Sequence, residues 1–111
     1  MNIPMDFEKL DDFIRESNLF DSTRDSLKLY LENWWNENKA AFLEDMGGDL
    51  ETVLNKYRFE NEGLSFSRSY FYALDYISVW IHIFDEEDSY ISEYTAFYDL
   101  DLEIFDDKMI R

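Results

Sequence analysis

The sequence has no cysteine, one proline and three glycines in 111 residues. Without cysteine the chain forms no disulfide and no thiolate metal site, so we expect packing alone to stabilise it in a reducing compartment such as the cytoplasm. With so little proline and glycine, it contains no stretch typical of a linker between domains. The sequence therefore predicts a single domain over residues 1–111.

Long apolar segments and basic side chains are also scarce. No window approaches the roughly 18 apolar residues that span a bilayer, and residues 1–6 lack the basic and apolar regions of a signal peptide, so we expect no membrane association. The 10 basic residues are outnumbered by 26 acidic ones, giving a net charge of −16 at pH 7. Such a charge repels nucleic acids, so we expect no nucleic-acid ligand.

Aromatic residues, by contrast, are abundant. They make up 19% of the chain, and 46% of all residues are hydrophobic, far above what a disordered acidic chain carries. We therefore expect one packed core beneath an acidic surface. Self-repulsion disfavours a symmetric dimer, so the free chain is predicted to be a monomer, and the same field accelerates encounter with a basic surface.

Residues 1–63 carry apolar side chains at the helical period. Those in 6–17, 22–46 and 49–57 each fall on one stripe of a helix. Ser22 and Asp49 are suited to begin the second and third of these helices, and Gly47 with Gly48 to end the second. We expect a turn at residues 61–63, so this part predicts two to three helices.

From Leu64 the apolar period changes to two, which is typical of strands. Strands are expected over 64–74, 77–83 and 90–98, with a fourth between 102 and 110 whose register the pattern leaves open. Polar loops at 85–88 and 99–101 separate the last three. Residues 64–111 therefore predict a four-stranded antiparallel sheet, and the whole chain an α+β fold with the helices packed on one sheet face.

The strand over 77–83 predicts what the other sheet face carries. If its isoleucines and valine face the helices, the alternating residues face away from them, and these are Tyr76, Ser78, Trp80, His82 and Phe84. One interpretation is an exposed aromatic strip at the centre of a binding surface. The other is that the helices wrap further round, or that the strand is buried on both faces.

Acidic residues in the loops of the sheet flank this strip. They suggest an anionic rim for a basic partner, although acids in turns also solvate strand ends and protect sheet edges from aggregation. Our candidate partner-binding residues are Trp80, His82 and Phe84 at the centre, with Asp85, Glu86, Glu87, Asp88, Asp99, Asp101, Asp106 and Asp107 around them.

No constellation in the sequence predicts catalysis. The sole histidine, His82, lies in mid-strand, and there is no cysteine to act as a nucleophile. Counted from Asp99, the sixth and twelfth positions of a calcium loop would be Ile104 and Ile110, where the loop needs glycine and glutamate. We therefore expect no enzyme, no metal site and no cofactor, with weak cation binding by carboxylates left open.

The stretch from Tyr90 to Asp107, YISEYTAFYDLDLEIFDD, consists of a strand, an acidic turn and a second strand ending in two aspartates. It resembles the closing hairpin of small acidic bacterial immunity proteins, which neutralise polymorphic toxins. Leu102 stands where such families usually place glycine, and the helical part matches no such family. The resemblance implies stoichiometric inhibition of a toxin enzyme, with acidic side chains placed where substrate phosphates normally lie.

Together these features predict an acidic protein-binding module that inhibits a basic partner such as a toxin nuclease. The alternative is a structural or regulatory interaction domain that uses the aromatic strip on a neutral partner. Salt dependence separates the two, because screening weakens attraction between charged surfaces and leaves apolar contacts in place.

Overall fold

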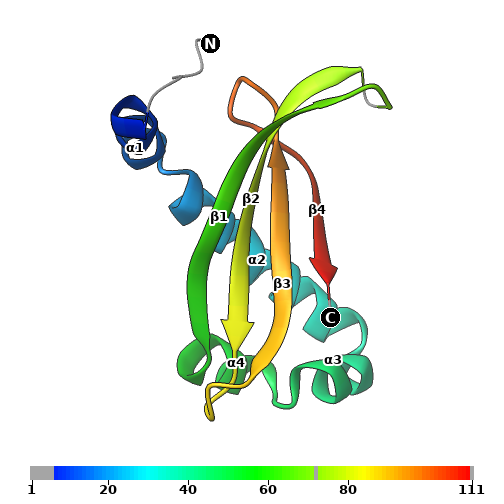
Figure 1. The fold of residues 1–111 in the computed structure, drawn as a ribbon. Helices are drawn as coiled ribbons and strands as arrows, with labels where there is room; N and C mark the ends of the chain where they lie inside the picture. Colours follow the sequence, from blue (N-terminus) through cyan, green and yellow to red (C-terminus); the bar gives the residue numbers. More distant parts are fainter. Residues whose placement is uncertain (1–6, 72, 111) are drawn as a thin grey trace.

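The protein is described by a computed structural model that covers residues 7–71 and 73–110, with side chains from residue 11 onward. The expected helix start at Asp6, and Tyr72 in the expected first strand, lie outside the described residues. Within them, four helices precede four strands (Figure 1): α1 (Phe7–Ser17), α2 (Leu19–Glu37), α3 (Lys39–Met46), α4 (Leu50–Lys56), β1 (Arg58–Ser69), β2 (Leu74–Phe84), β3 (Tyr90–Tyr98) and β4 (Ile104–Ile110). The α+β prediction is confirmed.

Two asparagines divide the helical part differently from the prediction. Asn18, with φ 54°, separates α1 from α2, so α2 begins at Leu19 rather than at the predicted cap, Ser22. The long helix expected to end at Gly47 is broken at Asn38, whose side chain accepts a hydrogen bond from the Ala41 amide at 3.1 Å. Asparagine both tolerates the left-handed region and caps a helix, which a hydrophobic period does not reveal.

The start of α4 follows the prediction. The Asp49 side chain accepts a hydrogen bond from the Thr52 amide at 2.8 Å, and this bond lowers the pKa of the Asp49 carboxyl. After α4 the expected turn at residues 61–63 is wrong, because Asn61 and Gly63 bracket a bulge inside β1. The sheet therefore begins at Arg58 rather than at Leu64.

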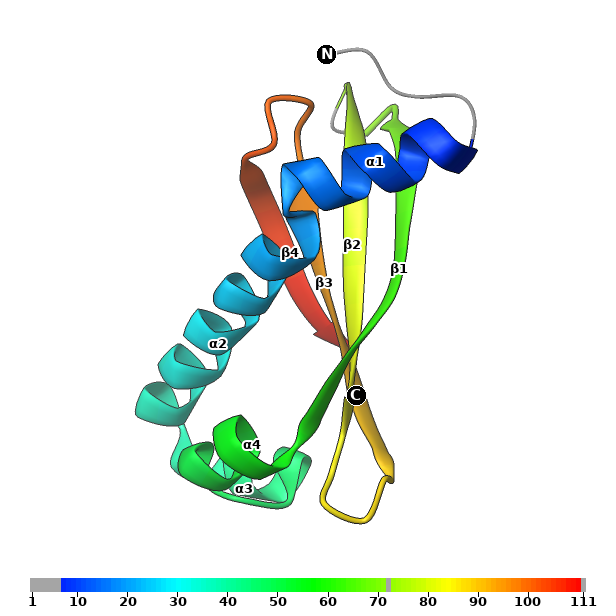
Figure 2. The ribbon, with the colours of Figure 1, turned by 90° about the vertical axis from the view of Figure 1, so that its left-hand side faces the viewer.

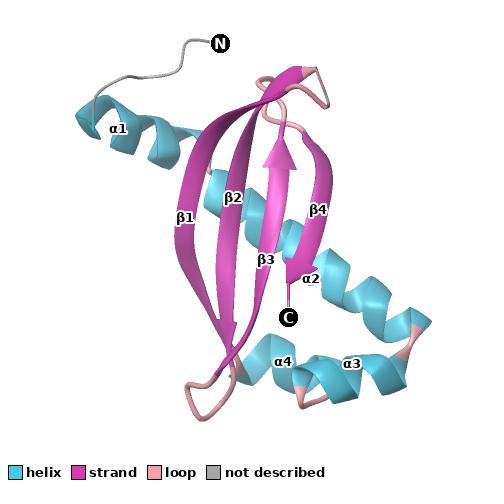
Figure 3. Ribbon diagram, turned by 45° about the vertical axis from the view of Figure 1, so that its right-hand side comes forward, coloured by secondary structure: helices cyan, strands magenta, loops and turns pink. Residues whose placement is uncertain are grey.

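The strands form an antiparallel meander in the order β1-β2-β3-β4, as predicted. In Figures 2 and 3 the helices lie to one side of the sheet, with α2 running across it, and no described helix covers the opposite side. We call the face turned away from the helices the open face. No helix within the described residues is long and apolar enough to cross a membrane.

The core lies between α2 and the central strands. Alternate residues of β2 face it, namely Ile77, Val79, Ile81 and Ile83, and each of them is 0% exposed. Two tyrosines of β3 reach from the same face to α2: the Tyr98 hydroxyl lies 2.8 Å from Thr23 Oγ1, and the Tyr94 hydroxyl lies 2.6 Å from Ser26 Oγ. These hydrogen bonds, the first of them fully buried, tie α2 to β3 where the helix crosses the sheet.

Candidate functional site

The open face carries the aromatic strip predicted from the period of β2. Because the isoleucines and valine of this strand face the helices, the residues between them face away: Tyr76, Ser78, Trp80, His82 and Phe84. Ser78 is buried among its neighbours, and the four rings are half-buried. The strip is therefore neither covered by helices nor fully exposed, because its rings pack against one another and against adjacent strands.

At one end of the open face, three rings form a cluster. The ring centroids of His82 and Tyr90 lie 5.2 Å apart, those of Phe84 and Tyr90 lie 6.0 Å apart, and those of His82 and Phe84 lie 6.4 Å apart. Tyr90 comes from β3 and is paired with Phe84 across the ladder. It is 52% exposed, so this cluster presents a ring to solvent.

Two carboxylates flank the histidine of this cluster. His82 Nε2 lies 3.1 Å from Glu93 Oε1, and Nδ1 lies 3.5 Å from Glu62 Oε2. A neutral imidazole has one N–H, so it donates to one carboxylate at a time, and only the protonated ring donates to both. Sequence reasoning missed both glutamates, although the pairing of His82 with Glu93 follows once the β2–β3 register is known.

Arg58 lies at the same end of the open face. Its guanidinium carbon lies 4.3 Å from the centroid of the Phe84 ring. It forms an ion pair with Glu60 and a second, at 3.3 Å, with Asp88. The hydrogen bond to Glu60 is the main cause of the raised pKa of Arg58. We call His82, Phe84, Tyr90, Arg58 and the carboxylates of Glu60, Glu62, Asp88 and Glu93 the acidic aromatic end.

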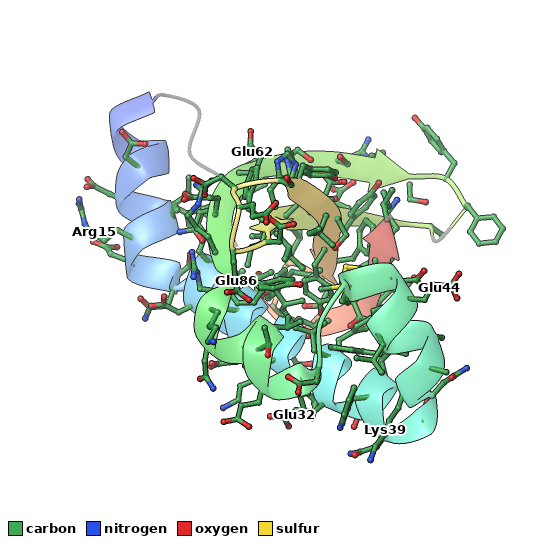
Figure 4. The ribbon with its side chains drawn as sticks, turned by 90° about the horizontal axis from the view of Figure 1, so that it is seen from below. Arg15, Glu32, Lys39, Glu44, Glu62 and Glu86 are labelled. Carbon is green, nitrogen blue, oxygen red and sulfur yellow. The ribbon has the colours of Figure 1, made fainter. Side chains whose placement is uncertain are left out.

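Figure 4 views the molecule from this end. Glu62 lies on the side away from the helices, whereas Glu32 and Lys39 project from the helical side. Glu86 lies in the loop that joins β2 to β3, next to the acidic aromatic end along the chain. Glu86 and Glu87 are exposed, so this loop extends the negative surface beyond the strand ends.

The two acidic loops have the same turn and lie at opposite ends of the sheet (Figure 1). Asp85 Oδ1 accepts hydrogen bonds from the amides of Glu87 and Ser89 at 2.8 and 3.0 Å. Asp99 Oδ1 accepts from Asp101 and Glu103 at 2.9 and 3.0 Å. The first aspartate of each loop therefore stabilises its own turn. The structure does not bring the two groups of candidate acids together.

The left-handed residue of each turn follows the same pattern. Asp88 has φ 61° and Leu102 has φ 64° at equivalent positions, where the amide of each donates to the first aspartate's carbonyl at 3.1 and 3.0 Å. Glycine is the usual residue there because it has no Cβ to clash. Aspartate tolerates this conformation better than leucine does.

The adjacent aspartates of β4 face opposite sides of the sheet. Asp106 is paired with Phe97 of the open face, whereas Asp107 is paired with Ala96, which faces the helices. Asp107 Oδ2 accepts a hydrogen bond from the Tyr94 hydroxyl at 2.7 Å. Our assignment of Asp107 to the same surface as Trp80 is therefore corrected, because neighbouring residues of a strand point to opposite faces.

The other end of the open face also carries aromatic rings. Tyr76, Phe97 and Phe105 form a second ring cluster with centroid separations of 5.9 to 6.4 Å. Trp80 lies between the two clusters along β2 and packs on Gly63 of β1. A Cβ at Gly63 would lie 2.3 Å from Trp80 Cζ2, so the indole can lie here only against a glycine. This contact explains why glycine stands at position 63, which we had predicted to lie in a turn.

The helical side contains a hollow of about 330 Å³ between α2 and α4. Its walls include Leu27 and Leu31, which are 2% and 0% exposed and therefore belong to the core. Arg24 on its rim already donates to the Phe59 carbonyl at 2.7 Å. Among the described residues, no group of three or more histidine, aspartate or glutamate side chains is placed to hold a metal ion.

No protein family, curated protein or solved structure matches this chain. The resemblance of residues 90–107 to immunity proteins therefore stays a prediction. The most distinctive chemistry of the described residues is on the open face, where aromatic rings and carboxylates lie side by side at one end.

Proposed function

We propose that this protein is an acidic binding module that inhibits a basic protein, such as a toxin nuclease, by docking its open face on that protein's cationic surface. The acidic aromatic end carries the proposal, since it combines a ring cluster with carboxylates from two strands, β1 and β3, and from the loop between β2 and β3. The domain would act stoichiometrically, as a monomer when free, and in the cytoplasm, which suits a chain without cysteine.

The ring cluster supports a binding role because aromatic side chains are favoured at the centres of protein interfaces. Tyr90 supplies exposed apolar area, while His82 and Phe84 hold it from two sides. A large ring that is packed on one edge and exposed on another loses little conformational freedom on binding. The cluster is thus preorganised for contact with another surface.

The charge supports a basic partner. A net charge of −16 attracts a cationic surface from a distance and raises the rate of encounter. At about 0.15 M salt this attraction is screened beyond about 8 Å, so the carboxylates nearest the contact set the rate. Glu86, Glu87 and Asp88 are the exposed acids of the loop adjoining the ring cluster.

The test is capture of the partner from source cells with the tagged chain, followed by stopped-flow measurement of association. We expect a one-to-one complex with a basic protein whose activity is lost when bound. A triple variant, Glu86→Gln, Glu87→Gln and Asp88→Asn, should associate about tenfold more slowly with little change in dissociation rate. Asp85 is left intact because it stabilises the turn.

The matched control is Glu37→Gln, Glu44→Gln and Glu51→Gln, three exposed acids of the helical side. It removes the same charge and should slow association about twofold or less. Equal slowing by both triple variants would mean that docking does not use the open face. An association rate independent of salt would instead indicate a neutral partner, and a captured enzyme that stays fully active would exclude inhibition.

A further inference from the structure

The contacts that Arg58 makes at the acidic aromatic end depend on the planar shape of its guanidinium group. Its guanidinium carbon lies 4.3 Å from the Phe84 ring centroid, and its two terminal nitrogens pair with Glu60 and Asp88. A guanidinium is planar, stacks on a ring and donates along a fork at its edge. An ammonium group is a compact point charge that stacks less well and is more strongly hydrated.

The contacts of Arg58 are also easy to exchange. Its side chain is 47% exposed, and those of Glu60 and Asp88 are 44% and 78% exposed. Exposed ion pairs contribute little to stability, so the guanidinium can swing into solvent at small cost. Phe84 would then present a bare ring face with two carboxylates at its rim.

The surrounding charge favours a second cation in that place. Glu62 and Glu93 flank His82, whose ring packs against Phe84, so carboxylates outnumber Arg58 around this cluster. Resting on the proposed function, we propose that the partner docks with an arginine side chain that takes the place of Arg58 on the ring of Phe84. Arg58 is then an internal competitor, and the surface selects arginine over lysine.

The test uses octa-arginine and octa-lysine as probes, titrated at about 0.15 M salt and followed by calorimetry. We expect the wild-type chain to bind octa-arginine about two- to fivefold tighter than octa-lysine, the size of a cation–π contact on an exposed ring. Removing the competitor by Arg58→Gln should tighten octa-arginine binding by a further factor of about two to five.

Arg68→Gln is the matched control for charge. Arg68 is also exposed and pairs with an acid, Asp75, at 2.7 Å, near the opposite end of the β1–β2 ladder, where no contact with Phe84 is made. It removes the same positive charge, so an effect of net charge alone would be equal in the two variants. We expect Arg68→Gln to change the affinity for octa-arginine by less than about twofold.

A second pair of variants tests the ring. Phe84→Leu should abolish the preference for octa-arginine, whereas Phe105→Leu, in the other ring cluster, should keep it. If Phe84→Leu fails to fold, the ring signals of Phe84 in the wild-type NMR spectrum serve instead, and they should shift with octa-arginine more than with octa-lysine.

Equal affinity for the two peptides, or equal effects of Arg58→Gln and Arg68→Gln, would overturn the arginine inference and leave the proposal of a basic partner standing. Binding of neither peptide, together with capture of no basic protein, would overturn both.

Discussion

The two faces of the sheet are made from the same strands and differ in what covers them. On the helix-facing side, Ile77, Val79, Ile81 and Ile83 are 0% exposed beneath α2. On the open face the intervening rings pack on one another and on neighbouring strands, and they keep part of their surface in solvent. The helices therefore bury one face of β2 completely and leave the other partly exposed, although both are rich in apolar side chains.

The largest contrast is expected between a core residue and a ring of the open face. Ile81→Ala should lower the free energy of unfolding by about 3 kcal/mol, because it leaves a cavity beneath α2. Phe84→Ala should lower it by about 1 kcal/mol, since its ring is half-buried and its neighbours can relax into solvent. Urea denaturation measures both. Equal losses would show that the open face is a second core.

The contact between β1 and β2 can be broken at Gly63. Gly63→Ala should lower the free energy of unfolding by about 2 kcal/mol, because the new Cβ displaces the Trp80 indole. In a Trp80→Leu background the same substitution should be nearly neutral. Denaturation of the four variants gives the coupling between the two positions, and a coupling near zero would contradict the close packing.

The adjacent aspartates of β4 distinguish the faces within one strand. Asp107→Asn and Tyr94→Phe should each lower the free energy of unfolding by about 1–2 kcal/mol, because they disturb the hydrogen bond at 2.7 Å between these residues. Asp106→Asn should change it by less than about 0.5 kcal/mol, because this side chain is exposed and asparagine keeps the Oδ1 atom that accepts a hydrogen bond from the Asp107 amide. If Asp106→Asn lowered the free energy of unfolding more than Asp107→Asn, this would show that Asp106 rather than Asp107 faces the helices.

At alkaline pH, loss of the proton from the buried Tyr94 hydroxyl should destabilise the fold. Burial is the main cause that raises the pKa of Tyr94 above its ordinary value of 10.0. The folded chain therefore keeps a proton that the unfolded chain has lost, so this contribution is full below pH 10 and falls as pH rises toward the folded pKa. The slope for one proton is about 1.4 kcal/mol per pH unit.

The measurement is thermal unfolding between neutral pH and pH 11 or above. Tyr94→Phe should flatten the alkaline part of the profile. Tyr90→Phe should flatten it less. Burial also raises the pKa of Tyr90, but this side chain is exposed whereas that of Tyr94 is buried. A wild-type profile that stays level above pH 10 would show that the Tyr94 hydroxyl is not buried in solution.

Much of the fold could be predicted because local chemistry repeats along the chain. The change from a helical period to alternation marks the two halves, and Asp49 caps its helix as its type suggests. The break at Asn38 and the bulge at Gly63 were missed. Each depends on one side chain whose role appears only with its partner, the Ala41 amide in one case and the Trp80 indole in the other.

The candidate site was predicted only in part, because alternation within one strand can be read from the sequence and pairing between strands cannot. Alternation alone places Trp80, His82 and Phe84 on one face, and the structure has them there. Tyr90 and Glu93 join them only through the β2–β3 register, which shifts at a bulge between Ile83 and Phe84. Because a slip of one residue turns every side chain of a strand over, register cannot be taken from composition.

Composition and apolar period along the chain are enough to predict its acidity, its single aromatic-rich core, its helices before strands, and a central strand with a ring-bearing face. Long-range packing leaves this face uncovered by the described helices, separates the two acidic loops to opposite ends of the sheet, and places Arg58 on Phe84. The physical reason is that periodicity acts between near neighbours in the chain, whereas these contacts join residues that strand pairing and helix packing bring together from far apart.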